Sequence, residues 1–256
     1  MTSGNGVFRV REGPGWSRGL EKLLHAELGR WFRSKKWWVQ IIIWAAVVNG
    51  ILALVIINED TEGSSGMAML VIGVCILMQG VIVGEKQSGT ADWIMSKPVS
   101  CPAFVLAKLV ANTIGITVTI LLAQGLIVYL LIFWGSGAFL PPLGFLGGLG
   151  VQLVHLLFYI TLSLALGAAF NKRGPVIAIP LAFIFVQELL IGVFPALVSV
   201  LPLTLTVPLD NGGYPSIATA LMTGSQPLTY LPLATTLAAS ALFVAIALWI
   251  FERLEF

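Results

Sequence analysis

The longest run without a charged side chain is the feature that most constrains this chain. It extends from Leu109 to Asn171 and contains 63 residues without Asp, Glu, Lys or Arg. A soluble domain carries about 25% charged residues, whereas this chain carries 10% and is 57% hydrophobic. So few charges cannot cover a surface that faces water, and we expect lipid to surround much of the chain.

The charge-free runs predict six membrane-spanning helices. A spanning helix needs about 20 apolar residues, so the longest run holds two spans. They are separated at Gly135-Ser136-Gly137 and Pro141-Pro142, where a helix should stop. Lipid cannot satisfy backbone polar groups, which predicts an all-α integral membrane fold. The expected spans are residues 38–57, 67–84, 104–133, 143–170, 175–198 and 229–251.

Two segments precede this transmembrane domain of residues 37–256. Residues 1–15 are Gly-rich and polar, and we expect a flexible cytoplasmic tail. Residues 16–36 place leucines and Trp31 at helical spacing among basic residues, with Ser17 as a plausible N-cap. Such a basic amphipathic helix is expected to lie on the inner leaflet as an elbow. It can act as an anchor alone or also contact a cytoplasmic partner.

The basic residues predict the orientation. Six spans place all 14 Lys and Arg on one side, and positive charge marks the cytoplasmic side. The opposite loops carry Glu59, Asp60, Glu62 and Asp210 without a base. We therefore expect both termini in the cytoplasm. The 14 basic residues are Arg9, Arg11, Arg18, Lys22, Arg30, Arg33, Lys35, Lys36, Lys86, Lys97, Lys108, Lys172, Arg173 and Arg253.

The loop at residues 85–103 carries the most specific pattern. Gly89 permits a turn with positive φ, and Thr90 can cap a short helix that Pro98 stops. Trp93 suits a membrane interface, and Ser100 can cap the next span. The pattern predicts a short surface helix between the second and third spans.

This stretch resembles the ABC-2 family of transporter permeases. Their loop typically has Glu-x-x-x-Gly-Thr, then Pro-Val-Ser and a later Lys. The small size, elbow helix and six spans also resemble that family. The matching residues here are Glu85, Gly89, Thr90, Pro98, Val99, Ser100 and Lys108.

The resemblance implies a bacterial inner-membrane permease, most often an exporter. It would work with a second copy of itself or a homologous permease and with a separate ATPase subunit that binds ATP and Mg. The short helix would be the coupling helix, with Glu85 bracing it and facing the ATPase. Relatives also have a re-entrant cap, expected here at residues 199–228, where the alternative is a simple outer loop. The implied ATPase-coupling residues are Glu85, Ser88, Gly89, Thr90, Asp92, Trp93 and Pro98.

The chain is not expected to be an enzyme or to hold a cofactor. It has no Gly-x-x-x-x-Gly-Lys-Ser/Thr loop to cradle phosphates, so ATP hydrolysis is expected on the partner. No nucleic-acid partner is expected. Its two cysteines, Cys75 and Cys101, are too few for a disulfide framework and are expected to be free thiols.

Polar residues inside the spans are candidates for the translocation path. Glu188 is expected about 24 Å from the inner end of its helix, in the outer third of the membrane. It can serve a substrate exit or gate, or simply reach outer-surface water. His155 can contact substrate or, as we favour, hydrogen-bond to another helix. Two histidines do not make a metal site. The path candidates are Glu188, His155, Gln152, Gln124 and Asn49.

Two other function classes are compatible with the composition. A secondary transporter would use its own ion site, usually between inverted repeats. A membrane-embedded enzyme would need catalytic side chains clustered at one depth. One intramembrane acid and no clear repeat make both alternatives weaker than the ATP-driven permease.

Overall fold

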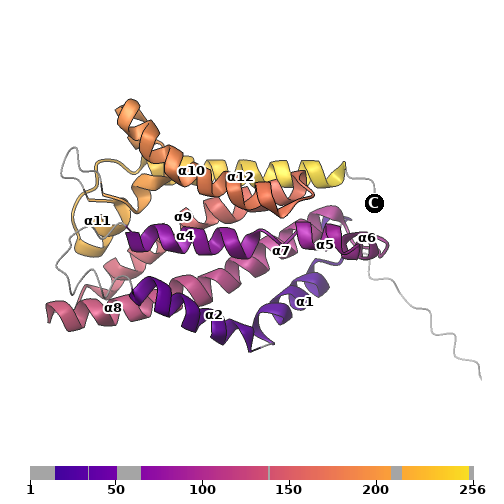
Figure 1. The fold of residues 1–256 in the computed structure, drawn as a ribbon, viewed down its shortest axis with the longest axis horizontal. Coiled ribbons are helices and arrows are strands. Elements are labelled where there is room, and N and C mark those ends of the chain that lie inside the picture. Colours follow the sequence, from indigo (N-terminus) through magenta and orange to yellow (C-terminus); the bar gives the residue numbers. More distant parts are fainter. Residues whose placement is uncertain (1–14, 34, 51–64, 138, 209–214, 254–256) are drawn as a thin grey trace, which may run out of the picture.

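The chain is a bundle of long helices that lie side by side in the computed structural model (Figure 1). The structure describes residues 15–33, 35–50, 65–137, 139–208 and 215–253. No strand occurs in these ranges, which confirms the all-α prediction for them. The predicted tail up to residue 14 and the acidic residues Glu59, Asp60, Glu62 and Asp210 lie outside the described residues.

The described ranges consist mainly of helical segments. The α-helices are α1 (Leu20–Phe32), α2 (Lys36–Trp44), α4 (Ser65–Met78), α5 (Val83–Gln87), α6 (Thr90–Met95), α7 (Cys101–Ile116), α8 (Ala123–Ser136), α9 (Pro142–Ala169), α10 (Arg173–Val193), α11 (Ile217–Thr223) and α12 (Leu231–Glu252). The π-helical segments are η2 (Ala45–Asn49) and η3 (Thr117–Leu122), and the 3₁₀ turns are η1 (Gly15–Ser17), η4 (Pro195–Ser199) and η5 (Pro202–Leu205).

Five helical stretches are long and apolar enough to cross a membrane. They are Leu70–Gln87, Cys101–Gly135, Pro142–Ala169, Arg173–Val193 and Leu231–Glu252. The predicted spans 143–170 and 229–251 agree with α9 and α12 to within two residues. The first predicted span, 38–57, is described only to residue 50, as α2 and η2, so its outer part lies beyond the described residues.

The second predicted span, 67–84, is not one regular helix. Residues 79–82 form turns between α4 and α5, and α5 extends three residues into the predicted loop. Gly80 lies in these turns, and a glycine in a helix interior costs about 1 kcal/mol relative to alanine. The sequence prediction was wrong here because the apolar run continues through the break.

The fifth predicted span, 175–198, is too long. α10 ends at Val193, and Phe194 has φ −127° and ψ 81° before the 3₁₀ turn that begins at Pro195. A residue that precedes proline is disfavoured in the α region, which explains the early end. Pro195 therefore ends the helix although the hydrophobic run of the sequence continues beyond it.

The third span extends beyond the predicted residues 104–133, because α7, η3 and α8 form one continuous helical stretch. The predicted Ser100 cap is confirmed, since its hydroxyl accepts a hydrogen bond from the Ala103 amide, at 3.3 Å, but the helix begins at Cys101, three residues before the predicted start. Both cysteines are free thiols, as predicted.

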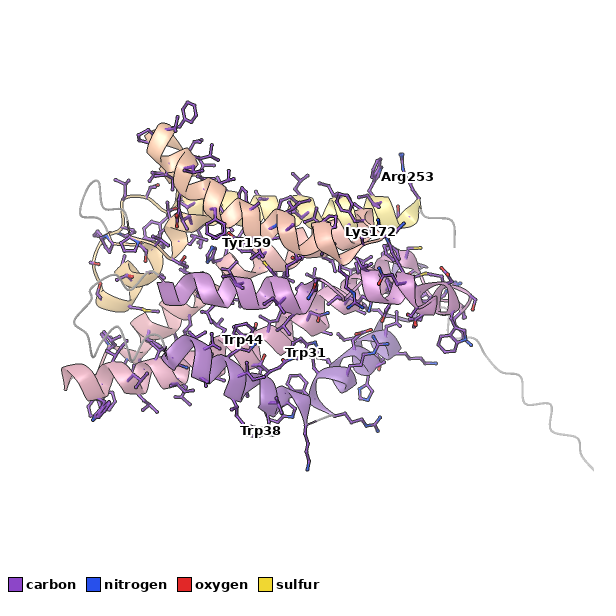
Figure 2. All side chains as sticks on the ribbon, in the orientation of Figure 1. Trp31, Trp38, Trp44, Tyr159, Lys172 and Arg253 are labelled. Atoms are coloured by element: carbon purple, nitrogen blue, oxygen red, sulfur yellow. The ribbon has the colours of Figure 1, made fainter. Side chains whose placement is uncertain are left out.

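Helix α9 is the centre of the packing, since it contacts α4, α7, α10, α11 and α12. Its Leu156, Ile160 and Leu164 are fully buried. We call the two ends of the bundle the α6 end, which also holds α5, and the α11 end (Figure 1). Lys172 and Arg253 lie toward the α6 end in Figure 2.

The segment 199–228 packs into the bundle at the α11 end. Leu205, Ile217 and Ala220 in this segment are buried. A Cβ added to Gly144 of α9 would lie 2.7 Å from the Leu221 carbonyl oxygen. Helix α11 can therefore approach α9 this closely only because residue 144 has no side chain. The described part of the segment is therefore not a loose loop but a pair of short helices fitted against the bundle.

Candidate functional site

Helix α1 packs against α7 through a tryptophan. The indole Nε1 of Trp31 donates a hydrogen bond to Oδ1 of Asn112, at 3.2 Å. Its ring covers Gly115, where an added Cβ would lie 2.3 Å from the ring. The helix begins after Gly19, which has φ +85°, and not at the predicted N-cap Ser17. Glycine adopts this left-handed conformation without steric cost, which explains the later start.

Four charged side chains join three helices beside this contact. Nη1 of Arg30 lies 2.9 Å from Oε1 of Glu27 and 2.6 Å from Oε1 of Glu85. Nζ of Lys108 lies 3.1 Å and 2.8 Å from the same two oxygens. We call these residues of α1, α5 and α7 the four-charge cluster.

The charges of the four-charge cluster are largely removed from water, so they need oppositely charged partners. The Lys108 side chain is only 2% exposed, and those of Glu27 and Glu85 are 12% and 10% exposed. Two acids and two bases cancel, so no net charge is taken out of water. The hydrogen bond that Arg30 donates to Glu85 is the main cause that raises the pKa of Arg30 above its ordinary value.

The position of Glu85 differs from the expectation for the loop. The resemblance implied that it faces a partner, but Glu85 is 8% exposed and points into the four-charge cluster. Its bracing function is compatible with this position, whereas a surface contact is not available to it in this conformation. The partners Glu27 and Arg30 were missed, and their three-residue spacing was the only signal that could have found them.

Helix α5 also binds the connection between α9 and α10. Nζ of Lys86 donates to the carbonyl oxygen of Ala168 and lies 3.4 Å from Oδ1 of Asn171. Nε2 of Gln87 donates to the Asn171 carbonyl oxygen, at 2.9 Å. The short helix α5 is therefore fixed to α1, α7 and the end of α9 at once.

Helix α6 follows through a glycine turn. Gly89 has φ +68° and occupies the N-cap position, as its predicted turn requires. Thr90 is the first helical residue and not the predicted cap; its hydroxyl lies 2.8 Å from that of Ser88. The left-handed glycine replaces a side-chain cap here, which is why the Thr90 prediction was wrong.

The outer side of α6 is available for contact. Ala91 and Ile94 are buried beneath the helix, while Asp92 is exposed and Trp93 is 63% exposed. Lys97 lies over the Trp93 ring, with Nζ 4.6 Å from the ring centroid. Pro98 is also exposed, three residues after α6 ends at Met95. The exposed residues among the predicted coupling residues are Ser88, Gly89, Asp92, Trp93 and Pro98.

Two of the path candidates are paired inside the bundle. Nδ2 of Asn49 donates to Oε1 of Gln124, at 2.7 Å, and both side chains are buried. Nε2 of Gln124 donates to the carbonyl oxygens of Ile41 and Thr119, at 3.2 and 3.3 Å. Asn49 is the last residue of the π-helical segment η2, and Gln124 lies in α8, two residues after the π-helical segment η3 ends at Leu122.

His155 forms a hydrogen bond to a residue outside the long helices. Its Nδ1 lies 3.3 Å from Oγ1 of Thr206, which follows η5. Gln152, also buried, lies one turn earlier on α9. Gln187 was not predicted, yet it is fully buried: it donates to the Tyr159 hydroxyl at 2.9 Å and accepts from the Leu203 amide at 3.1 Å.

Glu188 lies on the exposed side of α10, not inside the subunit. Its neighbours on that side include Phe185 and Leu189, which are 65% and 70% exposed. The adjacent Gln187 is the side chain of this pair that points into the bundle. Among the described residues, no group of three His, Cys, Asp or Glu side chains could hold a metal ion.

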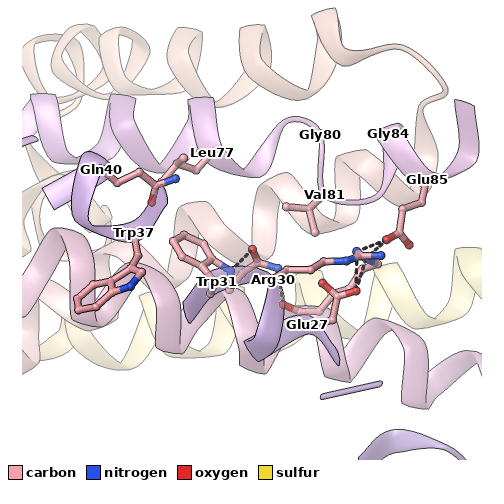
Figure 3. Close-up of a pocket in the computed structure, with 12 residues that line it drawn as sticks. Glu27, Arg30, Trp31, Trp37, Gln40, Leu77, Gly80, Val81, Gly84 and Glu85 are labelled. Atoms are coloured by element: carbon pink, nitrogen blue, oxygen red, sulfur yellow. Dashed lines mark hydrogen bonds and ion pairs between the residues drawn. The ribbon is translucent and has the colours of Figure 1, made fainter. Parts of the chain in front are cut away.

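A cavity of about 300 Å³ opens beside the four-charge cluster (Figure 3). It lies between α1 and α2 on one side and the break between α4 and α5 on the other. Its lining includes Trp31, Trp37 and Gln40 as well as all four cluster residues.

Comparison with known proteins adds no relative: no protein-family model matches this sequence, and no curated protein matches it. What the described residues define is an all-helical chain with five helices that could cross a membrane. A short helix, α6, lies exposed at one end of this bundle and is fixed to it through α5.

Proposed function

We propose that this chain is the membrane-spanning permease subunit of an ATP-driven exporter. The observation that carries the proposal is the attachment of the α5–α6 segment to the bundle. Through α5 it is bound to α1 and α7 by ion pairs and to the end of α9 by hydrogen bonds. A force on α6 would therefore reach three long elements together, as a coupling helix requires.

We also propose six spans with both termini in the cytoplasm, the first span being completed beyond residue 50. Several basic residues belong to connections or helix ends that lie at the α6 end. They are Lys86, Lys97, Lys172, Arg173 and Arg253. Positive charge favours the cytoplasmic side, which makes the α6 end the inner one. The resemblance of the loop at residues 85–103 to ABC-2 permeases supports the bacterial plasma membrane as the location in this proposal.

The partner in this proposal is a separate ATPase subunit that binds ATP and Mg. Its groove would receive the exposed side of α6, with Trp93 as the main contact and Asp92 and Ser88 around it. A buried tryptophan is a frequent centre of binding energy in protein interfaces. A second copy of the chain, or a homologous permease, would complete the translocation path.

A copurification experiment tests the proposal. Replacing Trp93 by Ala should reduce recovery of the ATPase on the tagged permease by about tenfold or more, since a central interface tryptophan contributes about 2 kcal/mol or more. Trp134→Ala is the matched control, because Trp134 is 84% exposed but lies in α8, far along the chain from α6. Equal recovery with Trp93→Ala and the wild type would contradict the proposed coupling surface.

One observation favours an ion-coupled transporter as the second candidate. The buried residues Gln152, His155, Tyr159 and Ser163 follow one face of α9 at helical spacing. Several polar atoms of this row have no hydrogen-bond partner within the described structure. They are both side-chain polar atoms of Gln152, Nε2 of His155 and Oγ of Ser163. Such a row could carry protons or ions. Transport by purified chain in vesicles with an ion gradient and no ATPase would favour this candidate.

A further inference from the structure

We propose that the cavity beside the four-charge cluster binds one phospholipid with a phosphoethanolamine headgroup. The cavity lies where the elbow helix α1 meets α2, α4 and α5. Its volume, about 300 Å³, is at the lower end of the range for small-molecule sites. It can therefore hold a headgroup and the beginning of an acyl chain, though not a whole lipid.

The lining changes from charged to mainly apolar along the cavity, and the neutral amide of Gln40 lies at the end that Trp37 and Leu77 form. Figure 3 shows Arg30 and Glu85 at one end and Trp37 and Leu77 at the other, with Val81 between them. A ligand that fits this gradient has a charged head and an apolar tail. Phospholipids have this form and are abundant at the end of a membrane bundle.

Arg30 provides the accessible positive charge. Its side chain is 55% exposed, whereas that of Lys108 is 2% exposed and already lies between both carboxylates. Both carboxylates accept from Nη1 of Arg30, which leaves the Nε and Nη2 donors for a ligand. A guanidinium binds phosphate oxygens with two parallel hydrogen bonds, so we place the lipid phosphate here.

Glu85 provides a carboxylate oxygen that can accept a hydrogen bond from the ammonium group of the ligand. Both bases bind its Oε1, while Oε2 is buried and has no partner within the described part of the chain. A buried carboxylate oxygen without a donor is unfavourable. A small rotation of this carboxylate would turn Oε2 toward the cavity that Glu85 lines, where a primary ammonium could donate to it.

The charge balance favours a zwitterionic headgroup over an anionic one. The four-charge cluster is neutral, with two acids and two bases. A net anion beside Arg30 would be repelled by the carboxylates of Glu27 and Glu85, whereas a phosphate with its own ammonium adds no net charge. A trimethylammonium has no N–H to donate, which separates phosphatidylethanolamine from phosphatidylcholine.

Native mass spectrometry of the full chain tests this inference. The chain is reconstituted in nanodiscs with equal amounts of phosphatidylethanolamine, phosphatidylcholine and phosphatidylglycerol, then released into mild detergent. We expect one retained phosphatidylethanolamine per chain. Arg30→Gln should reduce its retention about tenfold, as for the loss of a hydrogen bond to a charged group. Arg33→Gln is the control, since Arg33 is exposed at the C-cap of the same helix.

A second arm separates the lipid from its free headgroup. Glycerophosphoethanolamine, which lacks acyl chains, should not displace the retained lipid at the same concentration. No retained lipid, preference for phosphatidylglycerol or phosphatidylcholine, displacement by the free headgroup, or equal retention by Arg30→Gln would each overturn the inference. Lipid selectivity of the wild-type chain needs no variant and no ATP, so its failure is distinguishable from failure of the proposed coupling function.

Discussion

Nζ of Lys108 lies 2.8 Å from Oε1 of Glu85, and this ion pair joins the start of the third predicted span to the segment that follows the second. The lysine is almost fully buried, and its Nζ lies within 3.1 Å of both neighbouring carboxylates. The pair fixes the geometry between the bundle and the short helices α5 and α6, on which the proposed coupling depends.

Removing the buried base should destabilise the chain. Lys108→Met leaves Glu27 and Glu85 with only Arg30, and we expect the free energy of unfolding to fall by about 3 kcal/mol, at the low end for a broken buried pair. Thermal unfolding in detergent measures the loss. Lys97→Met, at an exposed site, should have little effect. The double change Lys108→Met with Glu85→Gln should be less harmful than Lys108→Met alone, because the excess negative charge is gone.

The contact between α1 and α7 should not tolerate a side chain at Gly115. Gly115→Ala would place a Cβ 2.3 Å from the Trp31 ring, and overpacking of this kind costs about 1–3 kcal/mol. Adding Trp31→Leu should recover part of the loss in unfolding temperature. Gly150→Ala is the control: an added Cβ there meets nothing within 4 Å, so it should leave stability equal or higher. A harmless Gly115→Ala would mean that Trp31 packs elsewhere.

Neighbouring glycines of α9 should differ in their response to alanine. At Gly144 an added Cβ lies 2.7 Å from a backbone oxygen of α11, which cannot move without displacing that helix. At Gly147 the nearest atoms are side-chain carbons of Leu221, at 3.7 Å. We expect Gly144→Ala to lower stability by about 1–3 kcal/mol and Gly147→Ala to be tolerated. Limited proteolysis near α11 should increase only for Gly144→Ala.

The Asn49–Gln124 pair predicts non-additive effects. Gln124→Leu leaves the buried Asn49 amide without its acceptor, at a cost of about 1–3 kcal/mol, while the Ile41 carbonyl keeps the hydrogen bond from the Ala45 backbone N–H. Adding Asn49→Leu removes the orphaned amide, so the double variant should lose less than the sum of the single changes. Additive losses in the unfolding midpoint would show that the two carboxamides do not interact.

The sequence predicted those features that depend on local pattern. The limits of α9 and α12 follow from charge-free runs, and the positive φ of Gly89 and the Ser100 cap follow from residue chemistry. The turns at residues 79–82 were missed because hydrophobicity continues through them.

The candidate site was less predictable, because its partners are distant in sequence. Glu27 and Lys108 are 81 positions apart, and neither pattern nor spacing pairs them. Gln187 and Glu188 are adjacent, and only the rotation of α10 decides which one is buried. The sequence analysis considered only the charged residue as a candidate, whereas the structure buries the neutral amide.

The most direct test of the central claim is the side of the membrane on which α6 lies. The native cysteines are first removed by Cys75→Ala and Cys101→Ser. Single cysteines are then introduced, in separate variants, at the exposed residues Ser96, beside α6, and Ser225, after α11. Intact cells that carry each variant are treated with a membrane-impermeant maleimide. We predict labelling at position 225 at once, and at position 96 only after the cells are permeabilised. Labelling of position 96 in intact cells would place α6 outside, where no ATPase could drive it, and would contradict the proposed permease.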